Sequence, residues 1–186
     1  MSDVGERMLA ELRRIREALE GAQPLGFGKR AQPVYVFVKH SPECLWYTRD
    51  KHEGQNVPVA ERDLTGYLRG VWRFDRADQG TGESVPKLML LVHTDRDYVI
   101  QSGLETNFSK SFLAGLLELP SEALSEPLTL IVEDNTGGKG RPTVFARLEW
   151  RGTRMMPAFS RSVVVENLLA QVQATFGLGS PFGAAE

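Results

Sequence analysis

The sequence predicts a mainly β protein in which five strands form a small antiparallel barrel, flanked by N-terminal and C-terminal helices. Three observations predict this fold. Short apolar or alternating segments recur between turn residues, as in strands. Only one helical segment, residues 106–119, interrupts the five strands between residues 64 and 150, whereas a parallel crossover fold needs a helix in nearly every connection. Two glycines lie inside a strand pattern at residues 64–75, which is typical of a strand that bends around a barrel.

The segment from Leu64 to Asp75 (LTGYLRGVWRFD) is the expected central strand. Successive side chains of a strand point to opposite faces, so alternation sorts its residues into two sets. One set is apolar and is expected in the core, including Trp72 and Phe74, and the other is aromatic and basic and is expected in solvent. The apolar set is Leu64, Gly66, Leu68, Gly70, Trp72 and Phe74, and the second set is Thr65, Tyr67, Arg69, Val71 and Arg73.

Composition narrows the class of protein. The chain has 186 residues, of which 41% are hydrophobic and 25% are charged, as is ordinary for one globular domain with extensions. No apolar run is long enough to span a bilayer and the N-terminus has no signal-like apolar segment, so we expect a cytoplasmic protein without membrane contact. Cys44 is the single cysteine, which excludes an intrachain disulfide and a cysteine-cluster metal site.

The net charge of -2 gives no overall attraction to nucleic acid, but the charges are unevenly distributed. Residues 134–161 contain six Lys and Arg against two Asp and Glu, whereas residues 105–126 contain one lysine against four glutamates. A nucleic acid would therefore have to bind to local clusters of basic residues.

Residues 1–21 are expected to form a helix in which Met8, Leu12, Ile15 and Leu19 are spaced as a short heptad seam. A lone helix of this length is marginal in water, so the seam packs either on its own domain or on copies of itself, which would make the protein a homo-oligomer. Residues 22–33 are then a linker rich in Gly and Pro, residues 34–176 the main domain and residues 177–186 a disordered tail.

The other elements follow from the same patterns. Thr106 is the expected N-cap of the helix at 106–119, and Pro120 ends that helix. The last helix is expected to turn Val164, Leu168, Leu169, Val172 and Phe176 inward. In chain order, the remaining expected elements are strands at 34–39, 44–48, 87–92, 98–101, 128–133 and 143–150, and the last helix at 160–176.

The order strand, strand, strand, helix, strand, strand over residues 64–150 resembles the OB fold, a five-stranded barrel found in many proteins that bind single-stranded nucleic acid. The glycine strand (LTGYLRGVWRF), the helix (TNFSKSFLAGLLEL) and two long loops carry the resemblance. It implies that a strand face and the loops at 76–86 and 134–142 contact the ligand. Bacterial single-strand-binding proteins also end in an acidic tip with Pro-Phe, and this chain departs from that pattern because Gly-Ala-Ala-Glu follows Pro181-Phe182.

Aromatic and basic residues occur together twice, as single-strand binding requires. Unpaired bases stack on aromatic rings, while arginine and lysine contact phosphates. Trp46 has an alternative place in the core, and exposed arginines on strands also protect sheet edges. The candidate nucleic-acid-binding residues are Trp46, Tyr47, Arg49, Tyr67, Arg69, Arg73, Lys87, Lys139, Arg141, Arg147 and Arg151.

The sequence therefore predicts a non-enzymatic OB-type protein that binds single-stranded DNA, with RNA left open, and acts in replication, recombination or repair without a cofactor or metal. An alternative is an assembly protein whose barrel and helices bind protein. A third is a metal-dependent nuclease using His93, Asp95 and Asp97, although these aspartates also suit a turn. A zinc site at His40, Cys44 and His52 matches no common spacing.

Overall fold

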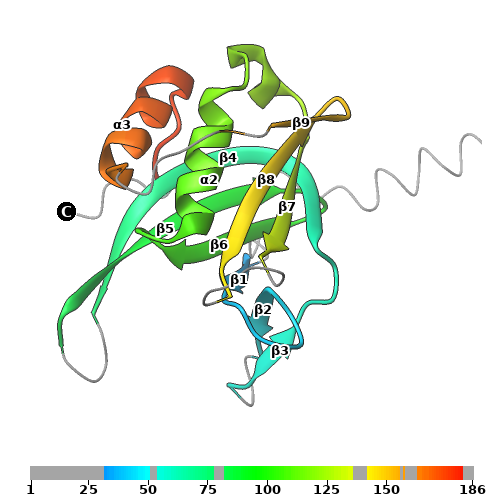
Figure 1. Ribbon diagram of the computed structural model, residues 1–186, viewed down its shortest axis with the longest axis vertical. Coiled ribbons are helices and arrows are strands. Elements are labelled where there is room, and N and C mark those ends of the chain that lie inside the picture. Colours follow the sequence, from blue (N-terminus) through cyan, green and yellow to red (C-terminus); the bar gives the residue numbers. More distant parts are fainter. Residues whose placement is uncertain are drawn as a thin grey trace, which may run out of the picture. The chain divides into compact units, whose positions relative to one another are not determined.

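The fold is arranged around β4 (Asp63–Ala77), a strand of 15 residues that changes its pairing partner along its length. Its first residues, from Asp63 to Gly66, pair antiparallel with β7, and the rest, from Tyr67 onward, pairs antiparallel with β5. In the computed structural model β4 forms a long arc behind α2 (Figure 1). A Cβ atom on Gly66 would lie 2.6 Å from the carbonyl oxygen of His93, so the change of partner requires glycine. The predicted bent strand is confirmed.

The structure describes residues 32–50, 54–77, 82–135, 142–155, 157 and 163–181, which all belong to one compact unit, Gln32–Glu186. The predicted helix at 1–21, most of the linker at 22–33, and Lys139 and Arg141 lie outside the described residues. The elements besides β4 are β1 (Val34–Val38), β2 (Trp46–Arg49), β3 (Asn56–Pro58), β5 (Ser84–His93), β6 (Asp97–Gly103), α2 (Asn107–Leu117), the 3-10 helix η1 (Ser121–Ser125), β7 (Leu128–Asp134), β8 (Val144–Trp150), β9 (Thr153–Met155) and α3 (Val165–Phe176).

The strands form one mixed sheet in the order β3-β2-β1-β6-β5-β4-β7-β8-β9. Every neighbouring pair is antiparallel except β1 and β6, which are parallel. The protein is mainly β with helices, as predicted, and the order strand, strand, strand, helix, strand, strand is confirmed from β4 to β8. The sheet has nine strands rather than five because β1 pairs along β6 and brings β2 and β3 with it, while β9 extends the other end.

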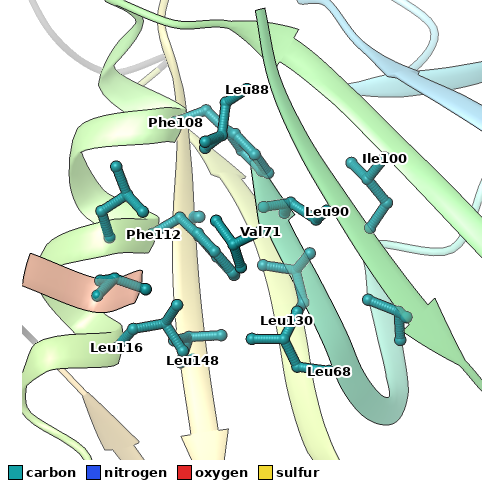
Figure 2. Close-up of a cluster of buried hydrophobic side chains, with 14 of the residues drawn as sticks. Leu68, Val71, Leu88, Leu90, Ile100, Phe108, Phe112, Leu116, Leu130 and Leu148 are labelled. Carbon is teal, nitrogen blue, oxygen red and sulfur yellow. The ribbon is translucent and has the colours of Figure 1, made fainter. Parts of the chain in front are cut away.

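The main core lies between the sheet and α2. Figure 2 shows Phe108, Phe112 and Leu116 of α2 pointing toward leucines and valines of β4, β5, β7 and β8. Thr106 caps the helix as predicted, because its hydroxyl accepts a hydrogen bond of 3.3 Å from the amide of Ser109. Within α2, the hydroxyl of Ser111 accepts a hydrogen bond of 2.8 Å from the buried main-chain amide of Ala146 in β8. This bond fixes the helix against the sheet.

The C-terminal helix α3 packs against α2 and β4. Val165, Leu169 and Val172 are buried, but Val164 is 52% exposed because it lies at the N-cap position, so its predicted inward orientation is wrong. The helix ends at Gly177, whose φ of 66° is favourable for glycine. The tail was expected to be disordered from this residue on, but Leu178 is buried, so the chain is packed at least one residue farther. Neither helix of the described chain is long and apolar enough to cross a membrane.

Candidate nucleic-acid interface

A β-bulge at Arg69 decides which side chains of β4 face the core. The register of β4 against β5 shifts between Leu68 and Gly70, so Arg69 is an extra residue without a partner in β5. One extra residue exchanges the two faces for every residue that follows it. Val71 is therefore fully buried in the main core, whereas Phe74 is 49% exposed.

The prediction that Trp72 and Phe74 lie in the main core with Leu68 is wrong, because it assumed uninterrupted alternation. Trp72 is half-buried and packs against a second apolar cluster, formed by Met89, Leu91 and Val99. These residues alternate with the residues of β5 and β6 that face α2, so the second cluster lies on the opposite side of the sheet.

We call this side of strands β3, β2, β1, β6, β5 and β4 the outer face. Pairing registers and strand alternation place a large set of aromatic and basic side chains on it. These residues are Tyr35, Phe37, Tyr47, Arg49, Tyr67, Arg69, Trp72, Phe74, Arg76 and Lys87.

Five side chains of the outer face form one row across neighbouring strands, which we call the cross-strand row. Phe37 of β1 lies opposite Tyr47 of β2 and, on its other side, opposite Gln101 of β6. Gln101 lies opposite Met89 of β5, and Met89 lies opposite Trp72 of β4. Directly opposed residues of neighbouring strands share a face. The row therefore has aromatic side chains at both ends.

The β1–β2 end of the row holds an aromatic cluster with one arginine. The rings of Phe37 and Tyr47 are stacked with centroids 5.3 Å apart and planes at 22°. The guanidinium carbon of Arg49 lies 5.5 Å from the centroid of Phe37, a cation–π contact. Tyr35, one alternation before Phe37 in β1, is 47% exposed. A pocket of about 420 Å³, which we call the hairpin pocket, has Tyr35, Phe37 and Arg49 among its walls.

Four basic side chains of the outer face have no carboxylate partner. Arg49, Arg69, Arg76 and Lys87 form no ion pair within the part of the chain that the structure describes. The guanidinium carbon of Arg69 lies 5.0 Å from the ring centroid of Tyr67. Among the strand residues that alternation puts on this face, the acids are Asp97, which lies 2.7 Å from His93, and Asp63, at the start of β4. The outer face is thus basic despite the negative net charge of the chain.

Arg73 does not belong to this set. Its Nε donates a hydrogen bond of 3.0 Å to Asp75, and its Nη1 lies 3.7 Å from Glu166 of α3. The hydrogen bond to Asp75 and the charge of that carboxylate raise the pKa of Arg73 above its usual value. Because α3 lies on the core side of β4, the predicted position of Arg73 beside Tyr67 is wrong. The reason is the same as for Trp72: the bulge at Arg69 exchanges the two faces of β4.

The basic residues of β8, β9 and the turn between them are neutralised by neighbouring glutamates. Arg147 donates to Glu133 at 3.3 Å, and Arg154 donates to Glu149 at 3.4 Å. Both Nε and Nη2 of Arg151 donate to the carboxylate of Glu126. These hydrogen bonds and the attraction between the charges raise the pKa of Arg151. Arg147 and Arg151 are therefore less available to phosphates than the basic side chains of the outer face that form no ion pair.

Trp46 lies in the core. Its side chain is 3% exposed, and its Nε1 donates a hydrogen bond of 2.6 Å to the carbonyl oxygen of Glu61. Stacking on a nucleic-acid base requires an exposed ring face, so Trp46 is excluded from the interface.

The structure brings part of the predicted site together. Tyr47, Arg49, Tyr67, Arg69 and Lys87 share the outer face, whereas Trp46, Arg73, Arg147 and Arg151 lie elsewhere; Lys139 and Arg141 remain predictions. The residues predicted from the sequence did not include Tyr35, Phe37, Phe74 and Arg76, which also lie on the outer face. For the first two a signal existed, because the segment Val-Tyr-Val-Phe-Val places aromatic residues at alternate positions of a strand.

Histidines with acidic neighbours were the other candidates for a site. Nδ1 of His93 lies 2.7 Å from Asp97, and Nε2 of His40 lies 3.6 Å from Asp134. Among the described residues, no three His, Cys, Asp or Glu side chains are grouped so that they could hold a metal ion. Comparisons of the chain with protein-family models, with curated proteins and with solved structures found no match.

Proposed function

We propose that this protein binds single-stranded DNA through the outer face, as a non-enzymatic OB-type protein acting in replication, recombination or repair. One observation carries the proposal. All the basic residues of β-strands that form no ion pair in the described chain lie on the face that holds the aromatic side chains; they are Arg49, Arg69, Arg76 and Lys87. The charges of basic residues on other β-strand positions of the described chain are compensated by carboxylates.

Single strands suit such a face for physical reasons. A base that is not paired exposes both faces of its ring, and stacking on an aromatic side chain contributes about 1 to 3 kcal/mol per base. Basic side chains without a carboxylate partner are free to neutralise phosphates and release the condensed counterions. A duplex hides its bases, so it would gain from the basic residues only.

The course of β4 supports the OB assignment. A long strand that pairs with β7 at its start and with β5 afterwards, and a helix between the third and fourth strands, are the arrangement that the OB resemblance implies. In this assignment β4 to β8 correspond to the five strands of the OB unit, and β1 to β3 extend its sheet beyond β6. Within the described residues β6 pairs with β1 and β5, and no pairing between β6 and β8 closes the five strands into the predicted barrel.

Fluorescence anisotropy with an oligothymidylate of about 16 nucleotides and a duplex of equal length tests the proposal, between about 50 and 200 mM salt. The informative variant is Arg49→Gln with Arg69→Gln. Its control is Arg147→Gln with Arg154→Gln, which removes the same charge from paired positions. We expect the first variant to lose at least about tenfold in affinity for the single strand and to have a shallower salt dependence, by about 0.7 per lost phosphate contact.

The control variant should keep most of its affinity, because its arginines are already bound to glutamates. Equal losses in both double variants would mean that only net charge matters, and would overturn the assignment of the outer face. A wild-type protein that binds no oligonucleotide would overturn the function itself and favour the alternative of an assembly protein.

A further inference from the structure

We propose that the hairpin pocket is a binding subsite for a single unpaired nucleobase, so that a bound DNA strand crosses the sheet from β4 to β2. This inference rests on the proposed function and extends its site to strands outside the five that form the OB-type unit.

The walls of the hairpin pocket have the chemistry that a nucleobase needs. Tyr35 and Phe37 present aromatic surface, and the guanidinium group of Arg49 is held over the ring of Phe37. A base can stack on an aromatic ring or on a guanidinium plane with similar tolerance of its identity. The volume of about 420 Å³ lies within the range of small-molecule sites.

Tyr47 completes the subsite from behind, because its ring is stacked on Phe37. A ring held in this way loses little further conformational freedom when a base stacks on it. The pocket is therefore organised for binding before the ligand arrives.

The cross-strand row connects the hairpin pocket with the second aromatic pair, Trp72 and Phe74. From Phe37 to Trp72 the row passes through β6 and β5, which is three steps between neighbouring strands or about 14 Å. Stacked nucleobases in a single strand are about 3.4 Å apart, so about four stacking intervals, or about five nucleotides, cover this distance.

Basic side chains without ion pairs flank both ends of the cross-strand row. Arg49 is two residues after Tyr47 in β2, and Lys87 is two residues before Met89 in β5, directly opposite Phe74. The pairing registers put Arg49 and Lys87 on opposite sides of the row. A DNA strand whose nucleobases follow the cross-strand row would therefore have a basic side chain near its phosphates at each end. This arrangement favours a path across the sheet over a path along one β-strand.

Photo-cross-linking and affinity measurements together test this subsite. An oligothymidylate of about 16 nucleotides carrying 5-iodouracil is irradiated with the full-length protein, and cross-linked peptides are identified by mass spectrometry. We expect cross-links to Tyr35 or Phe37 as well as to Trp72 or Phe74. Cross-links to the β4 and β5 peptides alone would overturn the subsite and leave the proposed function standing.

The matched variants use two cation–π pairs of the same kind. Phe37→Leu with Arg49→Gln removes two walls of the hairpin pocket, and Phe145→Leu with Arg147→Gln alters the equivalent pair on β8, where the guanidinium carbon lies 5.9 Å from the ring centroid. The hairpin variant should lose at least about fivefold in affinity, the β8 variant less than about twofold. Circular dichroism verifies that both remain folded.

An unchanged affinity of the folded hairpin variant would overturn the subsite. Complete absence of binding by the wild-type protein would overturn the proposed function together with this extension.

Discussion

The side-chain amide of Gln173 in α3 donates a hydrogen bond of 3.0 Å to the carbonyl oxygen of Val71, two residues after the bulge at Arg69. Beyond Gly66, β4 has a strand partner on one side only within the described part of the chain. Main-chain groups at such an edge need another partner, and Gln173 supplies one. The C-terminal segment also approaches this edge, because a Cβ atom on Gly70 would lie 2.9 Å from the carbonyl oxygen of Gly179. Both α3 and the residues that directly follow it therefore pack against this part of β4.

Replacing Gln173 by alanine should lower the free energy of unfolding by about 1 kcal/mol, because the carbonyl group of Val71 loses its partner in a partly buried place. Urea denaturation measures the change. Gln171→Ala is the control, since Gln171 is exposed on the same helix. If both variants unfold at the same urea concentration, the bond to Val71 does not stabilise the edge.

A pair of substitutions tests the reversal of faces at the bulge. Val71→Ala should destabilise the protein by about 2 kcal/mol, because Val71 is fully buried in the main core. Phe74→Ala should change stability by less than about 1 kcal/mol, because Phe74 is 49% exposed. Thermal and urea denaturation compare the two variants. Uninterrupted alternation along β4 would give the opposite ranking, so a larger loss for Phe74→Ala would disprove the bulge.

The same bulge marks the limit of what the sequence could predict. Alternation and turn residues identified β4, the order of strands and helix along the chain from β4 to β8, and the capped helix α2. These features depend on residues that are close together in sequence. The glycines at 66 and 70 indicated a bend, but they did not identify Arg69 as the extra residue, because a bulge is defined by the register against a partner strand, here β5. A shift of one position then exchanged the predicted places of Trp72 and Val71.

Ion pairing was beyond prediction for a similar reason. Arg73 meets Glu166, and Arg151 meets Glu126, across separations in sequence that no local pattern relates. Counting basic residues therefore selected Arg147 and Arg151, whose charges are compensated, together with Arg49 and Arg69, whose charges are not. The distinction depends on the tertiary structure.

Gly66 should tolerate no side chain, because the change of strand partner brings the main chain of His93 too close. Gly66→Ala would place its Cβ atom 2.6 Å from a main-chain oxygen that cannot move without shifting β5. We expect a loss of at least about 1 to 3 kcal/mol, as for other overpacked sites. Gly179→Ala is the control, since no atom lies within 4 Å of its added carbon. Equal melting temperatures for the two variants would contradict the close approach.

The last prediction concerns pH and the ion pair of Glu126. Hydrogen bonds from Arg151, the charge of that residue and a hydrogen bond of 3.0 Å from Nε1 of Trp150 hold the pKa of Glu126 below its usual value, against a smaller opposing effect of desolvation. A carboxyl whose pKa is lower in the folded state stabilises the fold when it is ionised in both states. This contribution is complete above the ordinary glutamate pKa of about 4.3 and is lost as the pH falls through the lowered value.

Glu126→Gln should therefore be less stable than the wild type near neutral pH, and the difference should shrink as the pH falls below about 4. Urea denaturation midpoints across this range measure the effect. Glu118→Gln is a suitable control, because Glu118 is exposed and forms no ion pair within the described chain, so this substitution removes a carboxyl group without removing an ion pair. A difference for Glu126→Gln that stays constant down to pH values below the lowered pKa would show that the ionised pair with Arg151 contributes nothing to stability, and that Trp150 and Arg151 are held by packing alone.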